Sequence, residues 1–232
     1  MNELNFTLKN TAKVALAALL FVAFGTSVSA QKNIHFGLKA VPGLYWVKSS
    51  TDGAQSDGAG FGFGYGAMLE FGLTENYYIV TGVDIVSAST KLKQDFITPT
   101  NTVVYQGQST IQYLQVPLFL KLKTQSIGAI KYFGQFGLGT GFALNAKNKY
   151  DVITTDNTGT KTVSTSDSNK DEVFFLREAL LIGLGLEYNL AGSTSIVAGV
   201  TYDNGFTPVL KDKSTNAKLT SKGITLTVGI LF

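Results

Sequence analysis

The residue types that usually carry catalysis are scarce in this chain of 232 residues, which contains one histidine and no cysteine. That histidine, His35, would need a nucleophilic side chain within hydrogen-bond reach to act as a general base in lipid or peptide hydrolysis. The local sequence places no serine or aspartate beside it, and no G-x-S-x-G segment occurs in the chain. We therefore expect no catalytic residue and no enzymatic activity.

Two glycine runs and a set of aspartates could suggest ligand sites. Gly60-x-Gly62-x-Gly64 and Gly137-x-Gly139-x-Gly141 are spaced like nucleotide-binding loops, but such a loop must open a helix. Strand-like alternation continues through both runs, so we reject nucleotide binding. The aspartates that could bind Ca²⁺ are Asp52, Asp57, Asp151, Asp156, Asp167 and Asp171. They lack the twelve-residue spacing of an EF-hand, so we expect no metal and no cofactor.

Charged residues that fall among the glycines of alternating segments are more informative. The positive ones are Lys39, Lys121, Lys123 and Arg177, and the negative ones are Glu70, Asp84, Glu187 and Asp203. Buried charges must be paired to be tolerated, so the equal numbers predict a neutral, plugged interior, with an ion-conducting lumen as the alternative. If the first hairpin folds about Gly53, Lys39 lies diagonally opposite Glu70, within reach of an ion pair.

Alternation of period two supplies the strands that would position these charges. Within residues 60–72, Phe61, Phe63 and Leu69 alternate with glycines and with Glu70. Successive strand side chains point to opposite faces, so one face is apolar and the other carries glycine and charge. Eight segments alternate in this way: 34–40, 60–72, 77–85, 114–123, 136–145, 180–189, 196–203 and 223–232.

The connections between these segments alternate in length. Short turns fall at 73–76, 124–128 and 191–193, and longer polar stretches near 48–59, 91–109, 147–171 and 207–221. This layout is typical of outer-membrane barrels. We therefore predict an all-β fold, an eight-stranded antiparallel up-and-down transmembrane β-barrel with both termini at the short-turn, periplasmic end. Pro117 cannot donate a ladder hydrogen bond, so we expect a bulge there, or a strand that begins after it.

Composition and aromatic positions favour a membrane over water. Only 15% of residues are charged, against about 25% in globular chains. The less apolar strand face is mostly glycine, whereas a soluble barrel would show water a face of lysine, glutamate, serine and threonine. Aromatic girdles are expected at both lipid–water interfaces. The predicted members are Tyr45, Trp46, Phe61, Phe63, Phe142, Phe174, Phe175, Tyr202 and Phe206 at the long-loop end, and Phe36, Phe71, Tyr77, Tyr132, Tyr188 and Phe232 at the turn end.

Residues 1–30 have the features of a cleavable signal peptide. A lysine-bearing start is followed by an apolar run over 14–25 and by small residues up to Ala30. The run is shorter than the about 20 residues of a transmembrane helix, so we predict cleavage after Ala30 and an outer-membrane barrel domain over 31–232. The formal net charge of +3 is spread thinly, without the basic stripe of a nucleic-acid-binding protein.

Several stretches resemble the PorT-like outer-membrane β-barrel family. Tyr113-Leu114-Gln115-Val116-Pro117-Leu118 is similar to the family's Y-[LI]-E-[IV]-P-L segment, with Gln115 in place of the usual Glu. Residues 134–147 resemble its glycine-rich fifth strand, and 183–188 and 202–206 resemble its later strands. The resemblance covers the whole mature chain and implies an outer-membrane barrel. The family's namesake takes part in type IX secretion, whereas most members have no assigned role.

We predict a non-enzymatic structural or binding scaffold in the outer membrane of a Gram-negative bacterium, and the resemblance implies an accessory role in protein secretion as one option. The alternatives are a lipid-modifying barrel enzyme and a narrow small-solute channel. The expected partners are outer-membrane lipid, the barrel-insertion machinery and other envelope or secretion proteins, but no nucleic acid. The machinery would recognise the C-terminal strand, which ends at Phe232.

Overall fold

The computed structural model describes residues 34–49, 55–97, 102–156, 159–168, 173–209 and 219–232. Their strands are β1 (Ile34–Ser49), β2 (Gln55–Gly72), β3 (Tyr77–Ile97), β4 (Thr102–Lys123), β5 (Ile130–Asp156), β6 (Gly159–Asp167), β7 (Leu176–Ala191), β8 (Thr194–Pro208) and β9 (Leu219–Leu231). No helix among these residues is long and apolar enough to cross a membrane. The predicted signal peptide and its cleavage site at Ala30 lie outside the described residues.

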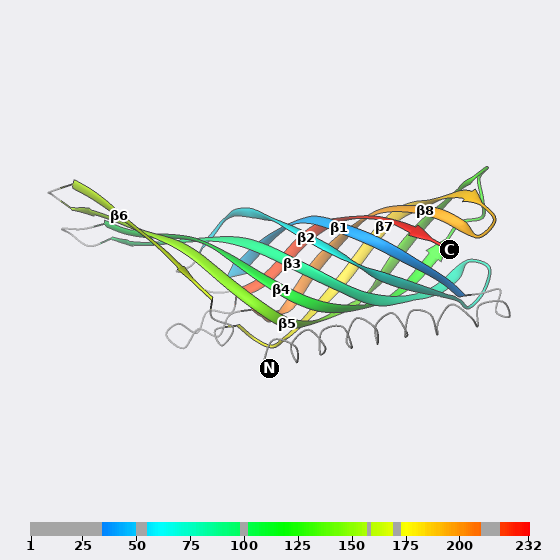
Figure 1. Ribbon diagram of the computed structural model, residues 1–232, viewed down its shortest axis with the longest axis horizontal. Helices are drawn as coiled ribbons and strands as arrows, with labels where there is room; N and C mark the ends of the chain where they lie inside the picture. Colours follow the sequence, from blue (N-terminus) through cyan, green and yellow to red (C-terminus); the bar gives the residue numbers. More distant parts are fainter. Residues whose placement is uncertain (1–33, 50–54, 98–101, 157–158, 169–172, 210–218) are drawn as a thin grey trace, which may run out of the picture. The chain divides into compact units, whose positions relative to one another are not determined.

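Eight of these strands close into a ring, which confirms the predicted fold class. The order around the ring is β1, β2, β3, β4, β5, β7, β8 and β9, and β9 pairs antiparallel with β1. β6 stays outside the ring and pairs antiparallel with the end of β5 (Figure 1). Closure leaves the ring strands no free edge, the condition for a sheet in lipid.

Because side chains alternate along each strand, apolar side chains cover the outside of the ring, and glycines and charged side chains face its interior. In β2, Phe61 is 64% exposed on the outside, and Gly60 and Gly62 are buried on the inside. Tyr77, Tyr132 and Phe206 are likewise exposed, as the girdle prediction requires. Tyr45 is an exception, because it is only 3% exposed and points into the barrel. The prediction had placed it in the outer girdle beside Trp46, but neighbours on a strand face opposite sides.

The connections at one end are short, as predicted. Residues 73–76 join β2 to β3, 124–129 join β4 to β5, and Gly192 lies with Ser193 in the turn between β7 and β8. Gly192 has a φ of +59°, a left-handed conformation that glycine adopts without steric cost. The start of β1 and the end of β9 meet at this same end, where the Phe232 amide donates to the Phe36 carbonyl at 2.7 Å.

At the other end, two of the predicted polar loops are strands instead. β3 and β4 continue in register from the pair Lys91–Gln108 to the pair Ile97–Thr102. β5 runs on to Asp156 and returns as β6. The loop predictions for 91–109 and 147–171 were wrong here because backbone pairing does not need an apolar face, and threonine and valine favour strands.

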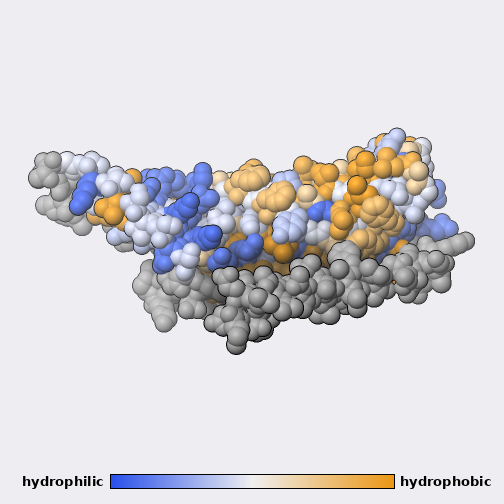
Figure 2. Space-filling model, in the orientation of Figure 1, coloured by the Kyte–Doolittle hydropathy of each residue, from blue (hydrophilic) through white to orange (hydrophobic). Residues whose placement is uncertain are grey.

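We call the parts of β3 to β6 at residues 91–97, 102–109, 147–156 and 159–167 the extension. Figure 1 shows the extension projecting from the end of the barrel opposite to the C-terminus, with β6 at its edge. In Figure 2 apolar side chains gather over the ring strands, and the surface turns polar toward the extension. The extension therefore continues the barrel wall beyond its apolar belt.

Pro117 produces neither of the predicted irregularities. β4 begins at Thr102, far before the proline, and Pro117 pairs with Gly139 of β5 in continuous register. On the β3 side the register is the same before and after it, as the pairs Thr81–Leu118 and Asp84–Gln115 show. Its carbonyl accepts a hydrogen bond from the Thr81 hydroxyl at 2.8 Å. Its missing N–H leaves a gap in the pairing of β3 with β4, between the pairs Thr81–Leu118 and Asp84–Gln115.

Candidate functional site

The barrel interior holds a cluster of four charged side chains toward the turn end. Lys121 donates to Glu70 and, at 2.5 Å, to Glu187. Lys123 lies 2.5 Å from the other Glu70 oxygen and 2.8 Å from Glu187. Glu70 is fully buried and Lys121 is 2% exposed. Each ammonium also lies 4.1 Å from the centre of an aromatic ring, Phe133 or Tyr78. The cluster is neutral, as burial requires.

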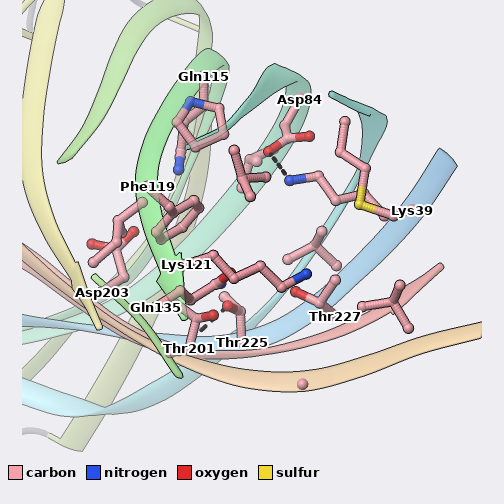
Figure 3. A pocket seen from close by; sticks show the side chains of 18 of the residues that line it. Lys39, Asp84, Gln115, Phe119, Lys121, Gln135, Thr201, Asp203, Thr225 and Thr227 are labelled. Carbon is pink, nitrogen blue, oxygen red and sulfur yellow. Dashed lines mark hydrogen bonds and ion pairs between the residues drawn. The ribbon is translucent and has the colours of Figure 1, made fainter. Parts of the chain in front are cut away.

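Two further pairs neutralise the remaining interior charges. Arg177 contacts Asp203 through two nitrogens, at 2.5 and 3.2 Å, and also donates to the Ser221 carbonyl at 3.3 Å. Lys39 reaches Asp84 at 2.8 Å, as the dashed line in Figure 3 shows. The predicted partner of Lys39 was Glu70, and this was wrong. Glu70 is taken by the two β4 lysines, and Lys39 instead meets the acid on β3.

Glycines on the inner face make room for the large side chains of the interior. A Cβ at Gly62 would lie 2.5 Å from the Tyr45 ring, and one at Gly223 would lie 2.7 Å from it. Tyr45 thus fits between β2 and β9 only because both facing positions lack a side chain. It belongs to a buried apolar cluster at the loop end, which also contains Val47, Val86, Ala88, Ile111, Tyr113, Ala143, Ala146, Val173, Val209 and Leu219.

Little open space remains inside the ring. The cavity among Lys39, Asp84, Gln115, Thr201 and Thr227 has a volume of about 60 Å³ (Figure 3), which is room for a few water molecules. The apolar cluster lies on its loop-end side, and the four-charge cluster lies toward the turns. Among the described residues, this cavity thus lies between two regions that are filled by side chains.

A second pocket, of about 310 Å³, opens at the turn end and contains His35. Its lining also includes Ser126, Ser193, Ser195 and Glu187. Local sequence had given no sign of these serines, because two turns distant in sequence bring them here. The His35 Nδ1 is buried without a hydrogen-bond partner among the described residues. No base-to-nucleophile hydrogen bond is therefore formed at this nitrogen.

The other candidates from the sequence fall in several places. Both glycine runs lie within strands, β2 and β5, as predicted. Asp57 and Asp151 line an open hollow of about 560 Å³ on the extension, and Asp57 accepts a hydrogen bond from Gln106 at 2.6 Å. Asp167 ends β6. Asp52, Asp171 and the side chain of Asp156 lie outside the described residues. Within the described part, no three His, Asp or Glu side chains group as a metal site.

The extension has two chemically different faces, fixed by its register. One face continues the inward side of the barrel and carries Tyr105, Tyr150, Val152 and Val163, with Tyr105 paired to Val152 and Val152 paired to Val163. We call this the inner face. Tyr105, Tyr150 and Val163 are 41%, 38% and 47% exposed. The opposite, outer face carries lysine, glutamine and serine near the barrel, and Asp151, Val104 and Ile153 farther out. Sequence analysis missed both faces because it assigned these residues to loops.

Comparison with known proteins agrees with the fold. The family model described as outer membrane protein beta-barrel domain matches residues 22–211. No curated protein matches the chain. Similar solved structures include Ail, the attachment invasion locus protein of Yersinia pestis, at 13% identity and a TM-score of 0.37, covering 87% of this chain and 100% of that one.

Two other similar structures come from different bacteria. OprG of Pseudomonas aeruginosa is 13% identical with a TM-score of 0.46, and the match covers 87% of this chain and 97% of that one. The outer membrane protease OmpT of Escherichia coli is 9% identical with a TM-score of 0.41, covering 89% and 99%. At these identities the likeness concerns the barrel fold alone.

Proposed function

Because the chain belongs to the outer membrane protein β-barrel family, we propose that it is a non-enzymatic membrane scaffold that holds a partner protein on its extension. The observation that carries this proposal is the inner face, where Tyr105, Tyr150 and Val163 stay exposed on a paired sheet. Tyrosine is enriched in protein interfaces, where its ring contributes large contact area. The inner face lies beyond the part of the ring whose outside is covered by apolar side chains, so lipid does not cover it.

The edge of the extension supports the same proposal. β6 pairs with β5 along one side, and in the described part of the chain no strand pairs with its other side. All nine of its residues are exposed. An open strand edge can add a strand from a partner through backbone hydrogen bonds. Lys161 on this strand disfavours pairing with a second copy of itself, as edge lysines do.

The interior supports scaffold over channel, and the turn-end pocket supports scaffold over enzyme. The central cavity of about 60 Å³ is closed in by paired charges and by the apolar cluster. Nothing in the described residues activates a nucleophile through the Nδ1 of His35. Both arguments favour a rigid anchor whose binding residues lie on the extension.

The placement of the chain in the envelope is part of the proposal. Residues 1–30 act as a signal peptide, and the short-turn end, with both barrel termini, faces the periplasm. The pairing of Phe232 with Phe36 at that end supports a role for the last strand in closing the ring, and we propose that the insertion machinery recognises it. The resemblance carried by residues 113–118 supports a secretion protein as the partner.

The test uses the tagged full-length protein, extracted from its own membranes in mild detergent after cross-linking. We expect a co-purifying envelope protein that Tyr150→Ser with Val163→Ser reduces at least ten-fold. Ile153→Ser is the matched control, because it removes an apolar side chain on the opposite face of the same strand. Equal recovery from the inner-face variant and the wild type would overturn the proposal, as would the absence of any co-purifying protein.

A further inference from the structure

We propose that the outer face of the extension is a binding site for phosphate groups on the carbohydrate headgroup of outer-leaflet glycolipids. The site lies at Lys91, Gln108, Lys149 and Ser166. These residues belong to four neighbouring strands, β3 to β6, and are directly paired in that order. Directly paired residues of antiparallel strands point to the same face, so the four side chains form one row.

This row lies within a built hollow. Lys91, Gln108, Lys149 and Ser166 all line the open space of about 560 Å³ on the extension. Strands are about 4.8 Å apart, so the two lysines flank Gln108 at roughly 10 Å from each other. Two ammonium groups at that separation, with an amide and a hydroxyl beside them, can surround one phosphate with charge-assisted hydrogen bonds.

The lysines of this row are not neutralised by acids. Lys91, Lys147 and Lys149 are exposed and form none of the ion pairs found among the described residues. Lys147 lies on the same face, one row nearer the barrel, and is paired with Thr110. In the barrel interior the opposite holds, because the four described cations there each contact a carboxylate: Lys39, Lys121, Lys123 and Arg177.

Acids appear only on the far side of the hollow. The next row away from the barrel pairs Lys93 with Gln106 and Gln106 with Asp151, and Asp57 accepts a hydrogen bond from Gln106. Among the residues that line the hollow, the side nearer the apolar belt therefore carries the two lysines without an acid, whereas on the side away from it Asp57 and Asp151 accompany Lys93. A phosphate that approaches from the membrane meets the lysines first.

The distance of this row from the apolar surface of the barrel distinguishes a glycolipid phosphate from a phospholipid phosphate. On the same face, the last fully apolar row is Ile85, Leu114 and Phe142, about six residues below Lys91 along β3. Six residues span roughly 20 Å of strand, or about 15 Å along the membrane normal at the usual barrel tilt. The phosphate of a glycerophospholipid lies too close to the acyl chains to reach that height. A phosphorylated sugar headgroup extends far enough.

The experiment measures lipid binding to the intact protein in neutral detergent by native mass spectrometry. The probes are a phosphorylated outer-leaflet glycolipid that includes its inner sugars, the same glycolipid after phosphatase treatment, phosphatidylglycerol and inorganic phosphate. We expect the phosphorylated glycolipid to bind at least ten-fold more tightly than the other three. Equal binding of phosphatidylglycerol, or competition by inorganic phosphate at similar concentration, would overturn the proposed ligand.

Variants test the site itself. Lys91→Gln with Lys149→Gln should weaken binding of the phosphorylated glycolipid roughly ten-fold or more, from the loss of two charge-assisted contacts. Asp151→Asn should strengthen it, because a repulsive carboxylate is removed. Lys161→Gln is the matched control, since Lys161 is paired with Thr154 on the opposite face of the same sheet. If Lys161→Gln weakened glycolipid binding as much as the double variant does, the attraction would be nonspecific, and the proposed site would be wrong. Unchanged heat-modifiable mobility verifies that each variant is folded.

Discussion

The barrel interior and the extension share strands, yet their charged side chains differ in burial and pairing. Those in the interior are paired and largely buried, whereas Lys91 and Lys149 of the outer face form none of the ion pairs found among the described residues. Inside the ring, Lys121 is 2% exposed and contacts two carboxylates. On the extension, Lys91 and Lys149 are exposed and line an open hollow. The difference arises where the sheet stops closing on itself. Past that point both faces of the strands meet water, and β6 is the last strand of the sheet in the described part of the chain.

Because of this difference, the interior charges contribute to folding stability and the charges of the extension are available for binding. A charge removed from water is costly unless it is paired, so the interior charges fix which residues face one another and fill the lumen. A charge left in water contributes little to folding and remains available to a ligand. We therefore expect substitutions inside the ring to change stability, and substitutions on the extension to change binding.

The largest effect is expected at Glu70. Glu70→Leu leaves Lys121 and Lys123 to share Glu187, and an uncompensated buried charge costs about 3–5 kcal/mol. Urea unfolding in lipid vesicles, followed by the fluorescence of Trp46, measures this loss. Lys161→Gln on the extension should change the free energy of unfolding by no more than about 0.5 kcal/mol. Similar losses in both variants would remove the contrast between the regions.

The Lys39–Asp84 pair should give the next largest effect. Lys39→Met and Asp84→Leu should each cost about 2–3 kcal/mol, somewhat less than Glu70→Leu because Lys39 is 11% exposed. The double variant should cost much less than the sum, because no charge is then stranded. A double-mutant cycle on the same unfolding measurement gives the coupling energy. Simple additivity would mean that the two charges do not interact.

A smaller loss is expected from crowding the Tyr45 ring. Gly62→Ala places a Cβ 2.5 Å from that ring and 2.5 Å from the Ser87 carbonyl oxygen, and overpacking of this kind costs about 1–3 kcal/mol. Gly134→Ala is the matched control, because a Cβ there meets nothing within 4 Å. It should leave stability unchanged or raise it slightly, since alanine restricts the unfolded chain. A stable Gly62→Ala protein would contradict the tight fit of Tyr45 between β2 and β9.

The smallest effect is expected from valine truncation on the extension. Val163→Ala, at a side chain that is 47% exposed, should change unfolding free energy by less than about 0.5 kcal/mol. Val197→Ala, at a side chain that is 2% exposed inside the ring, should cost about 1–2 kcal/mol through lost burial and the cavity left behind. If Val163 proved as costly as Val197, the extension would be part of the folding core.

Much of the ring could be predicted from sequence because its signal is local. Alternation within residues 60–72 is enough to place Phe61 outside and Glu70 inside, and the structure confirms both positions. The extension could not be predicted in the same way. Both of its faces mix polar and apolar residues, a pattern also found in loops. Only the pairing of β4 with β5 and of β5 with β6 holds them as strands.

The sequence by itself determined the strand faces, the equal numbers of interior cations and anions, and the glycine-lined interior, because a period of two depends only on neighbouring residues. Tertiary structure alone decided the contacts between strands. It placed Asp84 rather than Glu70 beside Lys39, packed the Tyr45 ring against Gly62 and Gly223, and brought Ser193 and Ser195 into the pocket of His35. The reason is that ring closure sets the stagger of all the strands together, and a local pattern carries no information about that stagger.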